Sequence, residues 1–237
     1  MFTRRLVLTA LGATSVAALA PSALWAAPIK PDEASALLVI DVQNCFLPGG
    51  SLAVKDGEQV VPIINRIAKG FANVVMTQDW HTAGHVSFAS SHSGKKPFET
   101  IDLKYGKQVL WPDHCVQGTD GANLHPALKI PHAELVIRKR YRKDVDSYSA
   151  FMEADGKTPT GLTGYLRDRG LTQVYLCGLA TDFCVGWSAV DARKAGFGAA
   201  VIEDACRGID VGGSLAKAWT DMQAAGVRRL QSSDLDV

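Results

Sequence analysis

The sequence lacks any Cys-x-x-Cys spacing, although it contains five cysteines among 237 residues. A structural zinc cluster of the kind held by such pairs is therefore not expected. The sequence also lacks an excess of charge of one sign. Its formal net charge is +1, and it falls by two, to −1, when Arg4 and Arg5 are left out. A near-neutral protein offers no electrostatic footprint for nucleic acid or an anionic membrane, so neither is expected as a partner.

A long apolar run is also missing, because the one at residues 6–20 is short for a helix that spans a bilayer. It follows a basic start with Arg4 and Arg5 and precedes a segment of mostly small residues, 21–26, which is the layout of a cleavable secretory signal. A retained membrane anchor is the alternative. We expect residues 1–26 to be an export signal of the twin-arginine type, with the general secretory route as the alternative. The mature protein would then be periplasmic or secreted, with no membrane contact after cleavage.

The rest of the chain lacks repeats and linkers, and apolar segments rich in β-branched residues alternate with helical patterns. Strands are predicted at 36–40, 73–77, 133–137, 173–177, 199–202 and 227–230, and helices at 58–69, 162–169, 182–194 and 215–225. The strands are continuously apolar, which is typical of a mainly parallel sheet with helices on both faces. We therefore expect one α/β domain, residues 34–237, with a three-layer, Rossmann-like architecture.

Polar residues follow several of these strands, where parallel sheets place their ligands. They are Asp41, the pair Gln78-Asp79 and the turn 178–184. The stretch 82–131 shows little periodicity, and a loop of that length in a compact domain is usually functional. The sequence therefore predicts a site at the carboxyl edge of the sheet.

Cys184 is the first candidate for chemistry, because it follows a strand and a turn and falls in the first turn of the next predicted helix. Asp182 could cap that helix. Backbone N–H groups and the helix dipole there favour a thiolate over a thiol and can stabilise an oxyanion. A buried, inert cysteine is the alternative, and it is what we expect of Cys177, inside a strand.

A metal site is the second candidate. Asp79 and His81 are two residues apart at a strand end and can face one ion. His114 is the leading third ligand, and His85 is a further candidate ligand or a neighbour of the ligands. Two histidines and one carboxylate leave positions open for water or substrate, as in catalytic zinc or non-haem iron sites. Alternatively, His81 and His85 are loop residues on a solvated surface. We expect the remaining histidines to be surface residues: His92, His125 and His132.

Two further residues are weaker candidates. Asp41 directly follows an apolar strand, where burial would raise its pKa and suit it to act as a general base; a turn cap is the alternative. Lys139 could pair with a carboxylate or steady a developing anion, although lysine is usually a surface residue. The basic run 138–143 that contains it is expected to be mostly a solvated loop.

Taken together, the segments resemble the nicotinamidases of the isochorismatase-like hydrolase superfamily. The resemblance extends from about residue 36 to 230 and rests on several separated motifs in one order. They are 38–50 (LVIDVQNCFLPGG), 77–88 (TQDWHTAGHVSF), 110–118 (LWPDHCVQG), 137–139 (IRK), 146–151 (DSYSAF), 178–185 (GLATDFCV) and 204–208 (DACRG).

The resemblance implies an amidohydrolase that acts on a linear carboxamide. Cys184 would attack the carboxamide carbon, Asp41 would pass the thiol proton to the leaving amine, and Lys139 would stand beside both. Water would then hydrolyse the thioester. The family has a cis peptide bond before the alanine of this turn, which corresponds to Leu179-Ala180 here. The backbone N–H groups of Ala180 and Cys184 would form the oxyanion hole.

The resemblance also implies ligands and substrate. Asp79, His81 and His114 match the metal ligands, and His85 matches a ligand found in some members only. The cofactor would be one divalent metal ion, zinc first, with iron and manganese as alternatives, and it would hold the ring nitrogen. Three residues match those that sandwich the aromatic ring: Phe46, Trp111 and Tyr148.

Nicotinamide, hydrolysed to nicotinate and ammonia, is accordingly the expected substrate, with pyrazinamide as a second. Another amidohydrolase of the superfamily, acting on carbamoyl or ureido groups, is one alternative. A non-catalytic periplasmic protein that binds nicotinamide or metal is the other. A homo-oligomer is left open.

The chain departs from the family at several points. Members commonly have an acidic residue where Cys45 stands and a glycine where Arg140 stands. Cys45 and Cys115 lie in motif loops near the expected site, and a disulfide between them would constrain the pocket mouth in an oxidising compartment. The export signal is the largest departure, since nicotinamide salvage is mainly cytoplasmic.

Overall fold

The computed structural model describes residues 28–237, so the predicted export signal, residues 1–26, lies outside the described residues. Six parallel strands form one sheet in the order β5-β2-β1-β6-β7-β8. The strands are β1 (Ser35–Ile40), β2 (Asn73–Asp79), β5 (Leu135–Lys139), β6 (Gln173–Leu179), β7 (Gly198–Arg207) and β8 (Arg228–Leu230). The predicted strands and their parallel arrangement are confirmed.

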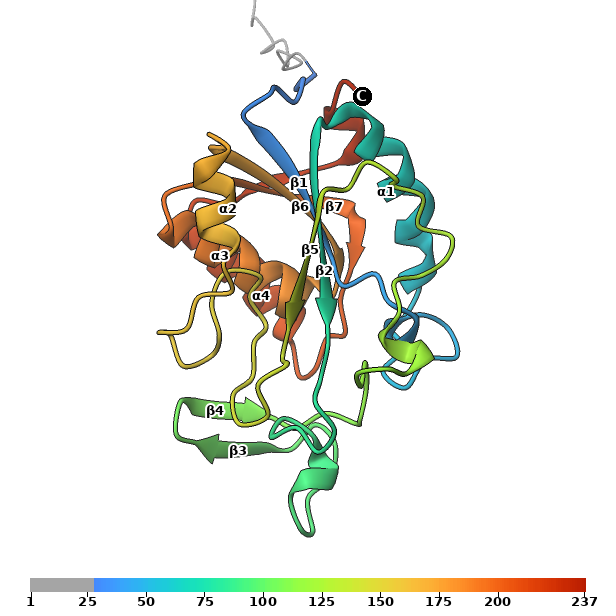
Figure 1. Ribbon diagram of the computed structural model, residues 1–237, viewed down its shortest axis with the longest axis vertical. Helices are drawn as coiled ribbons and strands as arrows, with labels where there is room; N and C mark the ends of the chain where they lie inside the picture. Colours follow the sequence, from blue (N-terminus) through green and yellow to red (C-terminus); the bar gives the residue numbers. More distant parts are fainter. Residues whose placement is uncertain (1–27) are drawn as a thin grey trace, which may run out of the picture.

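Helices cover both faces of the sheet, which confirms the expected three-layer α/β fold (Figure 1). The helices are α1 (Val60–Ile67), α2 (Leu162–Asp168), α3 (Gly186–Lys194) and α4 (Ser214–Ala224). Helix α1 lies on one face and the other three lie on the opposite face. The spacing of Val60, Ile64 and Ile67 places these apolar side chains on one buried stripe of α1, which packs against the sheet.

The strand order reverses beside β1, because β2 pairs with one edge of β1 and β6 pairs with the other. Ligand sites in parallel sheets form at such switch points, outside the carboxyl ends of the strands. Gly178 near the end of β6 makes the close approach possible there. Its φ is +115°, and a Cβ at this position would lie 2.1 Å from the carbonyl oxygen of Ile40. Only glycine fits this position.

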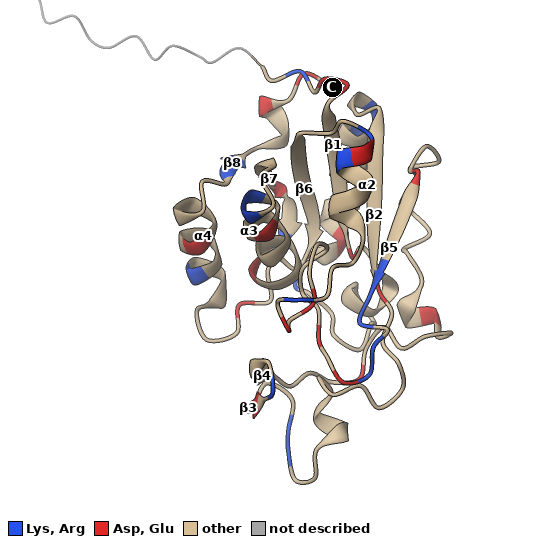
Figure 2. Cartoon of the chain, turned by 60° about the vertical axis from the view of Figure 1, so that its left-hand side comes forward, with Lys and Arg blue, Asp and Glu red and all other residues tan. Residues whose placement is uncertain are grey.

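The two central strands of the sheet contain no charged residues. Strands β1 and β6 carry none, whereas both signs are found along the helices and a basic segment runs from β5 into the following loop (Figure 2). Among residues 28–237, the helices are too short or too polar to cross a membrane.

The stretch 82–131 contains an antiparallel hairpin that the sequence patterns did not predict. Its strands are β3 (Thr100–Leu103) and β4 (Gly106–Val109), and it lies below the carboxyl edge of the sheet (Figure 1). Both strands contain polar or charged residues and lack the continuous apolar run by which the other strands were predicted.

The predicted helix cap at Asp182 is wrong. Thr181–Val185 forms a buried π-helical turn ahead of α3, and the Asp182 side chain makes no capping bond to it. Instead, the Asp182 carboxylate accepts hydrogen bonds from the backbone N–H groups of Ile209 and Asp210, at 3.0 and 2.8 Å. This side chain therefore ties the loop after β7 to the turn that carries Cys184.

Candidate active site

Four neighbouring strands each deliver one ionisable or nucleophilic side chain to the same edge of the sheet. Lys139 ends β5, Asp79 ends β2, Asp41 follows β1, and Cys184 lies in the turn after β6. In the sheet register Asp79 stands directly opposite Lys139. Each of the four residues is at most 4% exposed, so the parallel ladder brings them together out of contact with bulk water.

Lys139 links the two carboxylates. Its Nζ donates to Asp41 Oδ2 at 2.8 Å and to Asp79 Oδ1 at 2.5 Å, and it lies 3.7 Å from Cys184 Sγ. Burial works against the charge on the lysine, but the two carboxylates outweigh it and raise the pKa of Lys139. The ammonium therefore stays charged beside the sulfur.

Asp41 is held by a residue that sequence reasoning missed. Thr77 Oγ1 donates to Asp41 Oδ1 at 2.6 Å and accepts from the Asp41 backbone N–H at 3.1 Å. Thr77 precedes Asp79 by two positions, so strand alternation alone could have placed both on the same side. Burial, reinforced by the nearby Asp79 carboxylate, raises the pKa of Asp41 although Lys139 opposes the shift. Asp41 is thus a carboxylate with a strengthened affinity for a proton.

Cys184 differs from the expectation of a thiolate at a helix start. Burial raises the pKa of the Cys184 thiol well above its usual value, and the nearby Lys139 and Arg140 offset this only in part. The resting group is therefore the thiol, and a base must remove its proton. A carboxylate oxygen of Asp41 and the Sγ atom of Cys184 lie within 4.8 Å of each other. The peptide bond Leu179-Ala180 is cis, as the resemblance implies.

Cys184 lines a small pocket. Its walls include all three expected ring-stacking residues, and its lining is Phe46, Leu52, Asp79, Trp111, His114, Arg140, Tyr148, Ala180, Phe183, Cys184 and Ile209. Trp111 Nε1 donates to the Tyr148 hydroxyl at 2.9 Å, and the Trp111 and Phe183 rings meet edge to face at 4.8 Å. Phe183 and Ile209 were not anticipated as pocket residues, although Phe183 lies in the turn 178–184 that was expected to belong to the site.

A larger depression of about 800 Å³ lies nearby, and its lining includes Cys45, Cys115 and His114. Cys184 does not line it. The smaller pocket is therefore the candidate active site, because it holds the nucleophile.

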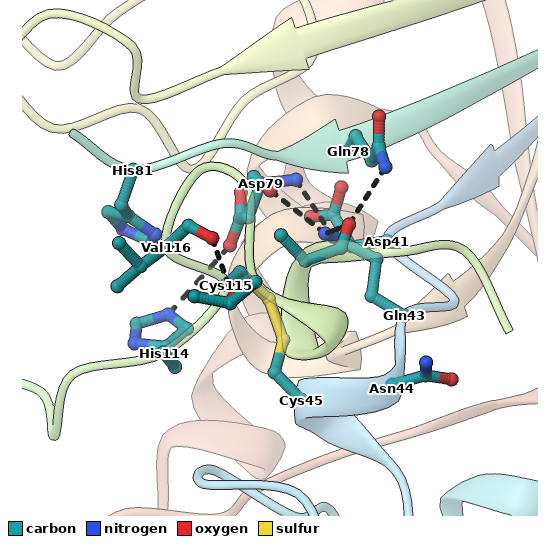
Figure 3. The surroundings of a disulfide bond; sticks show 12 residues. Asp41, Gln43, Asn44, Cys45, Gln78, Asp79, His81, His114, Cys115 and Val116 are labelled. Carbon is teal, nitrogen blue, oxygen red and sulfur yellow. Dashed lines mark hydrogen bonds and ion pairs between the residues drawn. A yellow bond between two sulfur atoms is a disulfide. The ribbon is translucent and has the colours of Figure 1, made fainter. Parts of the chain in front are cut away.

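Two of the predicted metal ligands, Asp79 and His114, line this pocket, and the third, His81, lies beside them. Asp79, His81 and His114 each offer a ligand atom within 4.8 Å of the others, and Figure 3 shows His114 facing Asp79. Among the described residues, Asp79 Oδ2 and His81 Nδ1 are buried without a hydrogen-bond partner. Burial lowers the pKa of His81 well below its usual value and that of His114 to about 4. Neutral imidazoles and a charged carboxylate are the forms that bind metal, so the donor set fits a divalent cation.

His114 is further fixed by its other ring nitrogen, Nδ1, which lies 2.8 Å from the Pro112 carbonyl oxygen. Metal-binding histidines usually have such a partner, because it fixes the tautomer and the ring orientation.

His85 is less suited to ligation. Its Nδ1 lies 2.8 Å from Ser87 Oγ, and its Nε2 lies 3.1 Å from the Val145 carbonyl oxygen. Both nitrogens are therefore engaged, and the ring packs edge-on against His81 at 4.8 Å. The structure thus places His85 beside a candidate ligand. Of the histidines expected at the surface, His132 is exposed, and His92 and His125 are partly buried.

Cys45 and Cys115 form a disulfide with a Cα–Cα distance of 5.6 Å (Figure 3). Cys45 precedes Phe46, and Cys115 follows His114, so the bridge joins the loop of a pocket wall to the loop of a candidate metal ligand. The other three cysteines are buried free thiols, including Cys177 inside β6.

We expected the basic run 138–143 to be mostly a solvated loop, and Arg138 and residues 141–143 are exposed, but the two residues between them are buried. Lys139 and Arg140 are 1% and 3% exposed, and Arg140 Nε lies 3.1 Å from Asp79 Oδ1. Gln43, which sequence reasoning also missed, fixes the backbone of the same aspartate. Its amide donates to the Asp79 carbonyl and accepts from the Asp79 N–H, each at 2.8 Å.

Comparisons with known proteins agree with this geometry. The family model described as the Isochorismatase domain matches residues 35–234. A nicotinamidase of Acinetobacter baylyi is 58% identical over 200 residues, which cover 84% of this chain and 94% of that protein.

Solved structures are similar as well. An Acinetobacter baumanii nicotinamidase and pyrazinamidase superposes with a TM-score of 0.85 at 60% identity, covering 86% of this chain and 98% of the other. A Pyrococcus horikoshii pyrazinamidase in complex with zinc superposes with a TM-score of 0.68 at 33% identity, covering 83% and 98%.

Proposed function

The chain belongs to the isochorismatase family, and we propose that it is a nicotinamidase that hydrolyses nicotinamide to nicotinate and ammonia. One observation carries the proposal: the Cys184 thiol lines a small pocket with aromatic walls for a flat ring, and the Asp41 carboxylate, whose pKa is raised, lies within 4.8 Å of that thiol. The nicotinamidases of Acinetobacter support the substrate. Pyrazinamide is a second substrate, since its ring nitrogen is placed like that of nicotinamide.

Cys184 is the nucleophile in this proposal. Asp41 takes the thiol proton, the sulfur attacks the carboxamide carbon, and the C–N bond breaks as Asp41 delivers the proton to the leaving amine. Water then cleaves the C–S bond of the thioester, which yields nicotinate and restores the thiol. Lys139 stabilises the thiolate through its position 3.7 Å from the sulfur.

The backbone N–H groups of Ala180 and Cys184 form the oxyanion hole. Ala180 directly precedes the π-helical turn Thr181–Val185, Cys184 lies within it, and both residues line the same pocket. Donors fixed in advance stabilise the charge that develops on the carbonyl oxygen without having to reorganise.

Phe46, Trp111 and Tyr148 enclose the ring. Asp79, His81 and His114 hold one divalent cation, with zinc as the first choice and iron or manganese as alternatives. The zinc complex of the Pyrococcus pyrazinamidase supports this choice. When bound, the cation supplies a Lewis-acidic docking point for the ring nitrogen, while the thiol and its charged neighbours carry out the bond breaking.

The protein is proposed to act outside the cytoplasm, after removal of an export signal at residues 1–26. The Cys45–Cys115 disulfide supports an oxidising compartment, because such bridges persist in the periplasm and are rare in the cytosol.

The test is ammonia release from nicotinamide by the mature protein, compared with a Cys184→Ala variant. We expect release by the parent protein and its loss, by at least about 10³-fold, in the variant. Cys177→Ala is the matched control, because it removes a buried thiol that does not line the pocket. If metal-replete parent protein left nicotinamide intact while hydrolysing another amide, the substrate assignment would be wrong.

A further inference from the structure

Arg140 occupies an unusual position between the candidate metal ligands and the nucleophile. Its backbone φ is +63°, a conformation that glycine adopts easily and a side chain such as arginine adopts at a cost in free energy. Its guanidinium is nevertheless buried. A strained backbone persists only where the surrounding contacts over-determine it, and such positions cluster at functional sites.

The guanidinium engages several groups at once. Nε donates to the Ser147 carbonyl oxygen at 3.1 Å and lies 3.1 Å from Asp79 Oδ1 and 3.3 Å from Asp146 Oδ1. Nη1 lies 3.2 Å from His81 Nε2, and Nη2 lies 3.5 Å from Cys184 Sγ. Two candidate metal ligands, Asp79 and His81, are thus in contact with a permanent cation.

The contact with His81 is decisive because arginine can only donate hydrogen bonds. His81 Nε2 must therefore accept, and its lone pair must lie on that nitrogen. A neutral imidazole has one such lone pair, so the proton then lies on Nδ1. A metal ion bound through Nε2 would displace Nη1. An ion bound through Nδ1 would move the proton to Nε2, where it faces the Arg140 N–H.

We propose that Arg140 and the divalent cation compete for His81, and that Arg140 thereby lowers the metal affinity of this site. The inference rests on the metal site of the proposed function. Coulomb repulsion acts in the same direction, since the guanidinium and the cation share the Asp79 carboxylate. Asp146 and the Ser147 carbonyl keep the guanidinium nearby after it releases His81.

The test is zinc affinity, measured on chelator-stripped protein by competition with a chromophoric chelator. Arg140→Gly removes the competitor and suits the positive φ, and we expect it to bind zinc at least about tenfold more tightly. Arg140→Lys keeps the charge without the forked donors, and its affinity should lie between the two. Arg142→Gly is the matched control, because Arg142 is 45% exposed, pairs with Glu153 and does not line the pocket. Its affinity should stay within twofold of the parent's.

An unchanged or weakened zinc affinity in Arg140→Gly would overturn the inference, provided that thermal unfolding shows the variant to be folded. If that variant is unfolded, Arg140→Lys decides: an affinity no tighter than the parent's overturns the inference. Failure of zinc to bind any of these proteins would also overturn it. Nicotinamide hydrolysis is assayed separately, so a wrong substrate assignment leaves the affinity comparison intact.

Discussion

The site divides into a strand-borne half and a loop-borne half that are built differently. Asp41, Lys139 and the Cys184 turn follow or end β1, β5 and β6, which together with β2 form one continuous parallel ladder that fixes their spacing. Phe46 and His114 stand on loops that a disulfide joins. In the proposed function this difference largely separates two tasks: the groups proposed to move protons and form bonds are placed by the sheet, whereas Phe46 and His114, proposed to contact the ring and the ion, depend on a cross-link between loops.

The loop-borne half has its own supports. The backbone N–H of His81 donates to the Cys115 carbonyl at 3.0 Å, and the N–H of Gln117 donates to the His81 carbonyl at 2.9 Å. These bonds connect the strand end at β2 to the loop that carries His114. These few bonds take the place of the continuous backbone hydrogen bonding of the sheet. We therefore expect the structure of the loop-borne half to be disturbed more strongly by reduction of the disulfide and by acid.

The strongest test of the strand-borne half is Asp41→Asn. The amide keeps the shape but cannot carry the thiol proton, so kcat for nicotinamide should fall by about 10³-fold. Steady-state ammonia release measures it. Asp182→Asn is the control, since it changes a buried carboxylate that holds the neighbouring loop. A loss in Asp182→Asn as large as that in Asp41→Asn would assign the effect to architecture and not to proton transfer.

The loop-borne half should depend on the disulfide. Replacing Cys45 and Cys115 together by serine frees a segment with a sequence separation of 70, and the free energy of unfolding should fall by about 3 kcal/mol. Urea denaturation measures the change. The KM for nicotinamide should rise more than kcat falls, because the wall residue and the ion ligand loosen while the nucleophile stays. Equal effects on both constants would show that the two halves are coupled.

In metal-free protein, lowering the pH should change the contributions of the two halves to the free energy of unfolding in opposite directions. The pKa of folded His114 is lowered from 6.5 to about 4, so the folded state binds fewer protons than the unfolded chain in that window. Stability from His114 should therefore fall as the pH drops, by about 2 kcal/mol between pH 6.5 and 4.5. Asp41 acts in the opposite direction, because its raised pKa lets the folded state take up a proton more readily.

Urea denaturation of chelator-treated protein at both pH values measures this effect. His114→Asn should show a smaller loss on acidification than the parent, and the surface variant His132→Asn should match the parent. A loss in His114→Asn equal to the parent's would place the acid sensitivity elsewhere.

Sequence patterns predicted the strand-borne half best. Continuous apolar runs identified the six strands, and the residues after them identified the edge where Asp41, Asp79 and Cys184 meet. This works because a parallel sheet converts position at a strand end into proximity in space. The position of Thr77 beside Asp41 could have been predicted in the same way, but a threonine in a strand does not by itself indicate a functional role.

The loop-borne half was less accessible to such reasoning. His114 lies far along the chain from Asp79, and although it was the leading candidate for the third ligand, no strand-end rule placed it beside Asp79. The roles of Asp182 and Arg140 depend on tertiary contacts with the loop after β7 and with His81, which no local pattern encodes. The pKa of Cys184 likewise depends on burial, which outweighs the helix-start effect that the sequence suggested.

The bridge between Cys45 and Cys115 closes a covalent ring that contains the exposed β3–β4 hairpin. A protease that cuts once at the hairpin tip, between Leu103 and Gly106, would open the backbone without separating the pieces. Under denaturing conditions the two pieces would stay joined until a reductant was added, and only then separate into two fragments. The bridge therefore keeps the two sides of a cut in the hairpin covalently joined for as long as the surroundings stay oxidising.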